Sequence, residues 1–140
     1  MKHTMFAFSN FEPCEVELDG EVYPTVEHAY QAAKSLRPED RAKIRRARTP
    51  GMAKKLGRVF GLRRDWEEIK FDVMRGLLEQ KFVQEPWRSR LLEHQGEIVE
   101  WNYWHDKIWG MCVCTDCRGK GANHLGRLMT EIRETILAVG

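Results

Sequence analysis

Glu27, Gln31 and Lys34 occupy positions i, i+4 and i+7 of a segment with helical character, so a helix projects all three side chains from one face. A carboxylate can transfer protons there, and an amine of lowered pKa can act as a nucleophile. Glu27 and Lys34 are roughly 10 Å apart along the helix axis, too far for a direct ion pair but within reach of one ligand. The same spacing is typical of a solvent-facing polar stripe, so it does not identify a site by itself.

A second group combines aromatic rings with a carboxylate. Trp101, Trp104 and Trp109 surround Asp106 in the sequence. Indole rings desolvate a neighbouring carboxyl and raise its pKa, which suits a general acid, and they also stack on heterocyclic bases. The alternative is a tryptophan-rich turn in which Asp106 is an ordinary turn residue. His105, taken alone, is typical of a surface or core histidine.

Three cysteines form the third group. Cys112, Cys114 and Cys117 could supply three ligands of a structural zinc ion, with Cys14 or His124 as the fourth, but no second Cys-x-x-Cys pair is present. Free thiols in a loop are the alternative. The following segment, 119–123, leads into a helix whose first amides could hold an anion. It matches neither a P-loop nor a dinucleotide-binding fingerprint.

Several elements must position these residues. Asp19-Gly20 predicts the turn of a hairpin over 15–23, and Thr25 is the expected cap of a helix that runs to about Ser35. Capping residues, apolar periodicity and prolines predict the remaining elements: helices over 38–49, 52–56, 65–84, 87–94 and 122–138, and a strand pair over 97–101 and 107–111. We therefore expect an α+β fold: a mostly helical single domain over 1–140 with one or two small antiparallel β-sheets.

The composition is that of a soluble globular protein, with 42% hydrophobic and 31% charged residues among 140. The sequence has no apolar run that could span a bilayer and no secretory signal at its start, so we expect a cytoplasmic protein with reduced cysteines. No membrane association is expected, and no obligatory protein partner is evident.

Positive charge is concentrated in one stretch. Between Arg37 and Arg64 there are eleven Lys or Arg residues against two acids, Glu39 and Asp40. Such a stretch is typical either of a solvated helix surface or of a surface that binds a phosphate-bearing partner, such as a nucleotide-like substrate or nucleic acid. Composition alone does not distinguish these alternatives.

Taken in order along the chain, these segments resemble the NADAR family. The resemblance rests on the segment from Tyr23 to Lys34, on Asn102-x-Trp104-x-Asp106-x-x-Trp109-Gly110, and on shorter matches: Ser9-Asn10-Phe11, Gly57-Arg58 and the segment from Gly121 to Met129. It covers almost the whole chain. The three late cysteines are not part of the family pattern, so a zinc ion would be a local addition.

The resemblance implies an N-glycosidase that hydrolyses the bond between a phosphorylated ribose and an amino-heterocycle. The substrate expected first is ADP-ribose on the exocyclic amine of guanine in nucleic acid. The alternative substrates are early ribosylamino-pyrimidine phosphates of riboflavin biosynthesis, which the enzyme would break down. From the residues alone, a further alternative is a non-catalytic, zinc-containing module that binds nucleic acid.

The family pattern also assigns roles to residues of this chain. It implies that Glu27, Lys34 and Asp106 are catalytic. The residues expected to bind substrate are Ser9, Asn10, Phe11, Gln31, Arg58, Trp104, Trp109, Gly121 and Asn123. No cofactor is required by this chemistry, and the possibility of a structural zinc ion at Cys112, Cys114 and Cys117 stays open.

Overall fold

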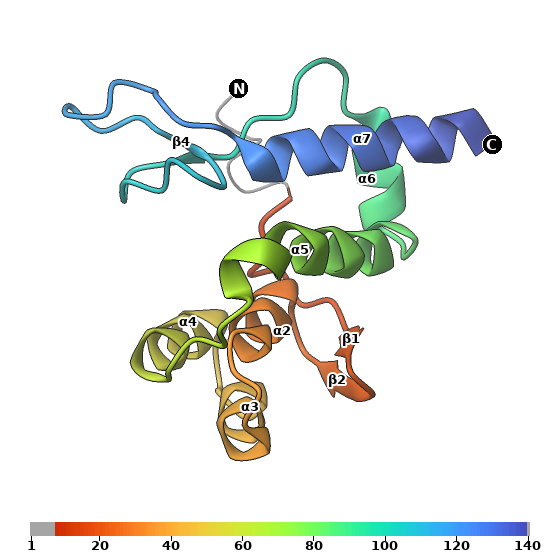
Figure 1. Cartoon of the computed structure of the whole chain (residues 1–140). Coiled ribbons are helices and arrows are strands. Elements are labelled where there is room, and N and C mark those ends of the chain that lie inside the picture. The colour runs from red at the N-terminus through yellow and green to blue at the C-terminus, as the bar shows by residue number, and fades with distance from the viewer. Residues whose placement is uncertain (1–7, 140) are drawn as a thin grey trace. The chain divides into compact units, whose positions relative to one another are not determined.

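The computed structural model describes residues 8–139 (Figure 1). Its elements, in chain order, are β1 (Val16–Leu18), β2 (Glu21–Tyr23), α2 (Val26–Ala33), α3 (Pro38–Arg45), α4 (Pro50–Val59), α5 (Trp66–Phe82), α6 (Trp87–Glu93), β3 (Trp101–Asn102), β4 (Met111–Cys112) and α7 (His124–Val139). The predicted α+β, mostly helical class is confirmed. Among the described residues, no helix combines the length and the apolar character needed to cross a membrane.

The chain forms two compact units, each with its own contacts. The N-terminal unit is Asn10–Lys81, and the C-terminal unit comprises, among the described residues, 8–9 and 82–139. The interpretation of 1–140 as one domain stays a prediction.

In the N-terminal unit, α2 is the central element, and α3, α4 and the β1–β2 hairpin pack against it. The hairpin is antiparallel, as predicted, and pairs Val16 with Tyr23. Its turn places Asp19 and Gly20 at positive φ, as a tight two-residue hairpin requires. Thr25 caps α2 by accepting a 3.0 Å hydrogen bond from the backbone N–H of His28.

The helix boundaries differ from the predicted ones mainly at α4. Thr49-Pro50-Gly51 was expected only to end the preceding helix; instead Thr49 is the N-cap of α4, accepting from the N–H of Met52 at 3.1 Å, and Pro50 begins the helix. The expected 52–56 helix therefore extends to Val59, which brings Gly57 and Arg58 into a helix that packs on α2.

In the C-terminal unit, α6 packs against α7. The guanidinium of Arg133 on α7 donates to the carbonyl oxygens of His94 and Gly96, at 2.8 and 3.0 Å, and so holds the segment after α6. Phe8 packs edge-on against Phe82 and His94.

The second sheet is parallel, so the predicted antiparallel pairing of 97–101 with 107–111 is wrong. β3 and β4 pair Trp101 with Met111 and Asn102 with Cys112 in the same direction. The reason lies in Asn102, whose side chain accepts from the N–H of Asp106 and donates to its carbonyl oxygen, at 3.0 and 2.8 Å. This closes a compact loop after β3 that returns the chain to the start of the strand, where the N–H of Met111 donates to Glu100.

Candidate functional site

The polar face of α2 is buried, so its interpretation as a solvent-facing stripe is wrong. Glu27 is 9% exposed and Gln31 is 3% exposed. The Gln31 amide donates a 2.6 Å hydrogen bond to Oε2 of Glu27. Burial raises the pKa of Glu27, and the hydrogen bond from Gln31 and the charges of Lys54 and Lys34 offset that rise only in part.

Lys34 continues this face at the end of α2. Its side chain is half-buried, and Nζ lies 5.5 Å from the centroid of the Tyr30 ring. Burial lowers the pKa of Lys34, the carboxylate of Glu27 opposes this, and the charges of Arg58 and Lys54 lower it further. The face therefore combines a carboxyl that is more readily protonated than usual with an amine that is more readily neutral, the combination that acid–base or nucleophilic chemistry requires.

Helix α4 contributes the cations and a close contact. A Cβ at Gly57 would lie 2.0 Å from Oε1 of Gln31, so only glycine allows α4 to approach the Gln31 side chain this closely. Lys54 and Arg58 lie one turn apart on the same helix, and both act electrostatically on Lys34. Lys54 was not predicted as a site residue; its i, i+4 relation to Arg58 was the signal available in the sequence.

Two further contacts, also not predicted, fix the orientation of α2. The ring of His28 bridges Oγ1 of Thr25, at 2.7 Å from Nδ1, and the carbonyl oxygen of Ala47, at 3.0 Å from Nε2. Tyr30 packs against Trp66 with ring centroids 5.1 Å apart. These contacts hold the polar face of α2 on a rigid element.

Asn10, a predicted binding residue, is hydrogen-bonded to the backbone of Glu27. Its carbonyl oxygen accepts a 3.1 Å hydrogen bond from the N–H of Glu27. Its side-chain Nδ2 donates to Sδ of Met74 at 3.6 Å, while Oδ1 is buried without a hydrogen-bond partner in the described structure. Such an acceptor is available to a ligand. Phe11 beside it is exposed.

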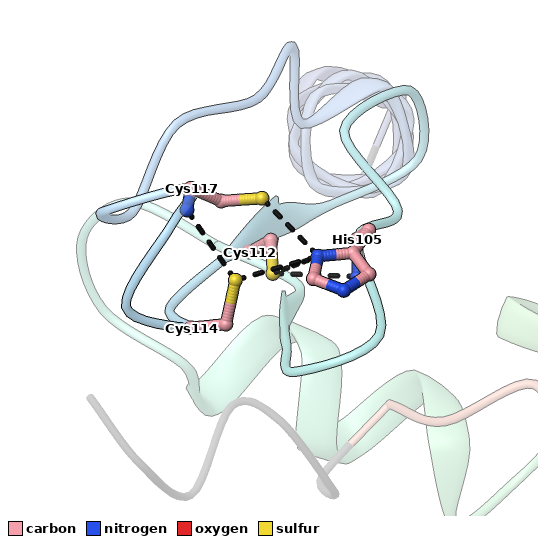
Figure 2. A group of neighbouring side chains, drawn as sticks. All are labelled: His105, Cys112, Cys114 and Cys117. Atoms are coloured by element: carbon pink, nitrogen blue, oxygen red, sulfur yellow. Dashed lines mark hydrogen bonds between the residues drawn. The ribbon is translucent and has the colours of Figure 1, made fainter.

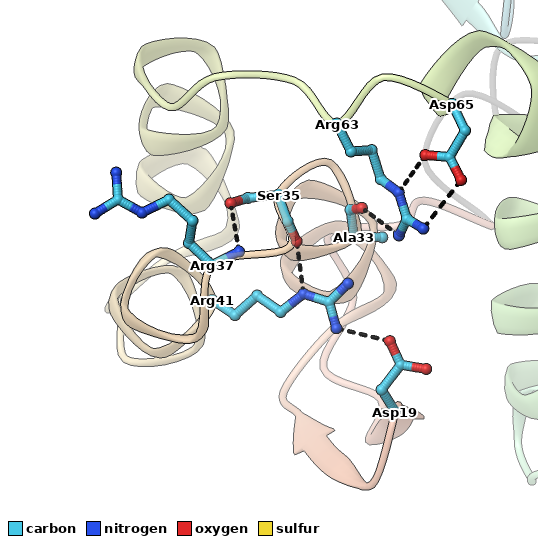
Figure 3. A network of polar contacts seen from close by, with 7 residues as sticks. All are labelled: Asp19, Ala33, Ser35, Arg37, Arg41, Arg63 and Asp65. Atoms are coloured by element: carbon cyan, nitrogen blue, oxygen red, sulfur yellow. Dashed lines mark hydrogen bonds and ion pairs between the residues drawn. The ribbon is translucent and has the colours of Figure 1, made fainter.

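Arginines organise the end of α2 (Figure 3). Arg63 donates from its backbone N–H to the carbonyl oxygen of Lys34 at 2.8 Å and pairs through Nε with Asp65 at 2.6 Å. Arg41 donates to the carbonyl oxygen of Ser35 and pairs with Asp19, both at 2.7 Å. A cavity of about 470 Å³, not expected from the sequence, begins one residue beyond Lys34. It is lined by Ser35, Leu36, Arg37, Asp40, Val59, Phe60, Gly61, Leu62 and Arg63.

In the C-terminal unit, Asp106 organises its own turn. Its Oδ1 accepts hydrogen bonds from the N–H groups of Ile108 and Trp109, at 3.1 and 2.9 Å. Asp106 therefore acts as a turn residue, which was the alternative to its interpretation as a general acid. Trp104 is 57% exposed, whereas Trp109 is half-buried with its ring 6.5 Å from that of His124.

Gly121 and Asn123 have extensive structural contacts. A Cβ at Gly121 would lie 2.2 Å from the carbonyl oxygen of Gly110, so this glycine allows two backbone segments to cross. The Asn123 side chain accepts from the N–H of Glu100 at 3.0 Å and donates to the carbonyl oxygen of Ile98 at 2.9 Å. Both residues therefore hold the loops of this unit in place.

The expectation that the amides at the start of the last helix hold an anion is wrong. The N–H groups of residues 122–125 donate to backbone carbonyl oxygens of residues 107–110, at distances of 2.8–3.3 Å. An anion would have to displace these hydrogen bonds. The helix itself begins at His124 rather than Ala122.

The late cysteines converge on His105, which was not predicted as their partner (Figure 2). Its Nδ1 lies 3.4 Å from the sulfur atoms of Cys114 and Cys117 and 3.8 Å from that of Cys112. The fourth member is thus His105, and neither Cys14 nor His124 belongs to the group. Proximity to Cys114, with burial, raises the pKa of Cys117 to about 11. Burial opposes ionisation of Cys112, but hydrogen bonds from Cys114 and His105 outweigh it and lower that pKa.

The predicted site residues are divided between the units. The N-terminal unit brings together Glu27, Gln31, Lys34 and Arg58 through α2 and α4, and it also holds Asn10 and Phe11. The C-terminal unit holds Ser9, Trp104, Asp106, Trp109, Gly121 and Asn123. A single site formed by both sets stays a prediction.

Comparisons with known proteins agree with the sequence resemblance. The profile of the NADAR domain matches residues 1–137. The chain is 38% identical over 133 residues to N-glycosidase YbiA of Escherichia coli K12, covering 92% of this chain and 80% of that protein. It is 37% identical over 135 residues to N-glycosidase Npun_R5314 of Nostoc punctiforme, covering 92% and 84%.

A plant protein and a solved structure extend the comparison. The maize riboflavin biosynthesis protein PYRR, chloroplastic, is 35% identical over 149 residues, which span 94% of this chain but 23% of that protein. The NMR structure of E. coli YbiA matches with a TM-score of 0.77 and 37% identity, covering 95% of this chain and 79% of that chain.

Proposed function

We propose that this chain, which belongs to the NADAR family, is an N-glycosidase that hydrolyses the bond between a phosphorylated ribose and the exocyclic amine of a heterocycle. One observation carries the proposal: the buried carboxyl of Glu27, held by Gln31, shares a helix face with Lys34, and the two pKa values are shifted toward each other. The relatives named N-glycosidases support the reaction class. The reaction consumes one water and releases a free amine and a phosphorylated ribose.

Glu27 is the proton donor in this proposal. Because its pKa is raised by burial, a larger fraction of the carboxyl is protonated near neutral pH than for an ordinary glutamate. The proton moves to the leaving nitrogen as the C1′–N bond breaks, and the nitrogen keeps the bonding electron pair. The resulting carboxylate stabilises the positive charge that develops at C1′ and then accepts a proton from the attacking water.

Lys34 offers a covalent alternative. If the sugar ring opens, the glycosylamine becomes an imine, and neutral Nζ attacks its C1′ carbon. Expulsion of the heterocyclic amine leaves a Lys34 imine, which water hydrolyses to restore the lysine and release the sugar. Burial and the nearby charges of Arg58 and Lys54 favour the neutral amine that this route requires.

The proposal also assigns substrate-binding roles to individual side chains. The buried Oδ1 of Asn10 accepts from a ribose hydroxyl, and Arg58 pairs with a phosphate. The exposed indole of Trp104 stacks on the heterocycle. Because Asp106, Gly121 and Asn123 bind their own loops, we assign them positioning roles; Ser9, Phe11 and Trp109 remain proposed lining residues.

The substrate we favour is a ribosylamino-pyrimidine phosphate of the riboflavin pathway. The riboflavin-biosynthesis name of the maize relative supports this choice. The basic stretch supports this choice as well, because four of its arginines already form ion pairs with carboxylates of the chain. The pairs are Arg37–Glu39, Arg41–Asp19, Arg45–Glu21 and Arg63–Asp65. A small substrate with one phosphate needs few of the remaining cations.

ADP-ribosylated guanine in nucleic acid is the second candidate. It is favoured by the concentration of basic residues over α3, α4 and the segment between them, of which Lys43, Arg46, Arg48, Lys55 and Arg58 are exposed. A nucleic acid substrate would also make turnover fall steeply as salt increases, because each phosphate contact releases counterions.

The deciding experiment is turnover of both substrates by the same preparation. We expect release of the aminopyrimidine from the ribosylamino-pyrimidine phosphate, and loss of that release in Glu27→Gln but not in Glu68→Gln, which changes an exposed glutamate on α5. Release of ADP-ribose from a modified oligonucleotide at a higher kcat/KM would instead favour the second candidate. Turnover of neither substrate would contradict the proposed function.

Borohydride added during turnover tests the covalent route. A Lys34 imine is reduced to a stable adduct that raises the protein mass by the sugar phosphate. The adduct should be absent in Lys34→Met. If no adduct forms and Lys34→Met retains near-normal rates, hydrolysis proceeds by direct attack of water.

A further inference from the structure

We propose that His105, Cys112, Cys114 and Cys117 bind one zinc ion, and that this ion is a structural component of the C-terminal unit. The four residues are the imidazole and three thiols drawn in Figure 2, and their candidate ligand atoms all lie within 4.8 Å of one another. The proposal does not depend on the proposed function, because none of these residues has a role in the hydrolysis described above.

The distances fit a tetrahedral metal ion. With Zn–S bonds of about 2.3 Å and a Zn–N bond of about 2.0–2.1 Å, a regular tetrahedron separates nitrogen from each sulfur by about 3.6 Å. The observed separations of Nδ1 from the three sulfur atoms are 3.4, 3.4 and 3.8 Å. The N–S separations therefore match those around a tetrahedral zinc ion, and all four atoms lie within 4.8 Å of one another.

The chemistry of the donor set selects zinc. Three thiolates with one imidazole form a soft, tetrahedral set typical of structural zinc, whereas Mg²⁺ and Ca²⁺ prefer oxygen ligands. None of the four cysteines forms a disulfide in the structure, so the three thiols of this group are available to a metal. A bound cation also compensates the negative charge of three neighbouring thiolates.

Backbone hydrogen bonds already support thiolate ligands. The N–H of His105 donates to the sulfur of Cys112, and the N–H of Cys117 donates to the sulfur of Cys114, both at 3.3 Å. Such bonds orient the sulfur atoms and stabilise negative charge on them. His105 is held at φ +67°, a conformation that residues other than glycine rarely adopt, and this conformation lets its ring contact the three sulfur atoms.

The ion would connect segments that have little regular structure of their own. The ligands come from the turn after β3, from β4, and from the loop that follows β4. β3 and β4 have only two residues each, and the loop is closed by a few backbone contacts such as Gly119 N–H to the Cys112 carbonyl oxygen. Four protein ligands fill the tetrahedron and leave no position for a substrate or water, which makes the site structural rather than catalytic.

Metal analysis of the purified full chain tests the proposal. Under reducing conditions we expect one zinc per chain, and the cobalt-substituted protein should show the visible bands of tetrahedral Co(II) with sulfur-to-cobalt charge transfer. Replacement of the partly exposed ligand in Cys114→Ala should weaken zinc binding on the order of 100-fold or more. The matched control is Cys14→Ala, which removes the cysteine outside the group and should keep full zinc binding.

Stability measurements separate metal loss from misfolding. Zinc should raise the Tm of the apo wild type and of Cys14→Ala, but leave that of Cys114→Ala unchanged, while circular dichroism shows that all three proteins are folded. Failure of the reduced apo protein to bind zinc at excess metal would overturn the proposal. So would a disulfide among these cysteines in freshly purified protein, detected as a mass lower by two hydrogens and by a reduced count of titratable thiols.

Discussion

The side-chain amide of Gln31 lies between Glu27, one turn earlier on α2, and Gly57 on α4, and it holds the carboxyl of Glu27 in place. Its nitrogen donates to Oε2 of Glu27 at 2.6 Å, and a Cβ at Gly57 would lie 2.0 Å from its oxygen. The absence of a side chain at Gly57 therefore leaves the space that the Gln31 amide occupies. The hydrogen bond that lowers the pKa of the Glu27 carboxyl therefore depends on a glycine in α4.

Replacement of Glu27 by Gln should abolish most activity while retaining the fold. The amide oxygen of the new side chain can still accept from Gln31, but it cannot donate a proton to a leaving amine. We expect kcat to fall by about 10²–10⁴, the usual contribution of general acid–base catalysis. Steady-state kinetics of Glu27→Gln and Glu68→Gln provide the measurement, and unchanged kcat in Glu27→Gln would remove Glu27 from this role.

The same substitution should increase stability above acidic pH. Burial raises the pKa of Glu27 above its ordinary value of 4.5, so folding favours the protonated form. Below pH 4.5 the carboxyl is protonated in both the folded and the unfolded chain, and it does not affect stability. As the pH rises from 4.5 through the raised pKa of the folded state, the carboxyl ionises first in the unfolded chain, and this lowers the stability of the wild type. Thermal unfolding should therefore show equal Tm values at low pH and a higher Tm for Glu27→Gln at neutral pH. A lower Tm of the variant at neutral pH would contradict the assigned direction of the pKa shift.

Lys34 should show the opposite pH dependence. Burial is the chief cause that lowers its pKa in the folded state from 10.5. The charged amine therefore destabilises the fold at neutral pH, and this effect is absent above pH 10.5, where the amine is neutral in both the folded and the unfolded chain. Lys34→Met should then unfold at a higher Tm than the wild type at neutral pH, with the difference shrinking as pH rises through the range between the two pKa values. Arg58→Met provides the comparison, because it removes a cation from the same face while leaving Lys34 in place. Equal pH profiles of Tm for Lys34→Met and the wild type would show that folding does not lower the pKa of Lys34.

Gly57→Ala should impair activity more than stability. The added methyl group displaces the Gln31 amide and breaks its hydrogen bond to Glu27, since this methyl carbon would also lie only 2.9 Å from Cδ of Gln31. Overpacking of this kind costs about 1–3 kcal/mol. Gly76→Ala on α5, where a Cβ meets nothing within 4 Å, is the matched control and should be neutral or slightly stabilising. Comparable kcat values for the two variants would show that Gln31 does not position Glu27.

The helix cap and the hairpin turn were predicted correctly because they depend on neighbouring residues in the sequence. Thr25 caps α2 and Asp19-Gly20 turns the hairpin as expected, because both preferences act within a few residues. The burial of Glu27 could not be predicted from its helical position, since it depends on the approach of α4, and that approach requires Gly57. His105 was overlooked for a similar reason: only the loop closed by Asn102, with a left-handed residue at 105, turns the imidazole toward the cysteines.

Asp106 offers a test that distinguishes positioning from acid catalysis. Its Oδ1 accepts from the N–H groups of Ile108 and Trp109, and an asparagine at this position preserves that acceptor while removing the ionisable carboxyl. We expect Asp106→Asn to retain both its Tm and at least about a tenth of the wild-type kcat, because general acid catalysis would contribute about 10²–10⁴ and is assigned to Glu27. Asp106→Ala leaves two amides without their acceptor and should lose about 1–3 kcal/mol of stability. Thermal unfolding and kinetics of both variants provide the measurement. A loss of kcat in Asp106→Asn as large as that in Glu27→Gln, with an unchanged Tm, would instead make Asp106 a direct participant in the reaction.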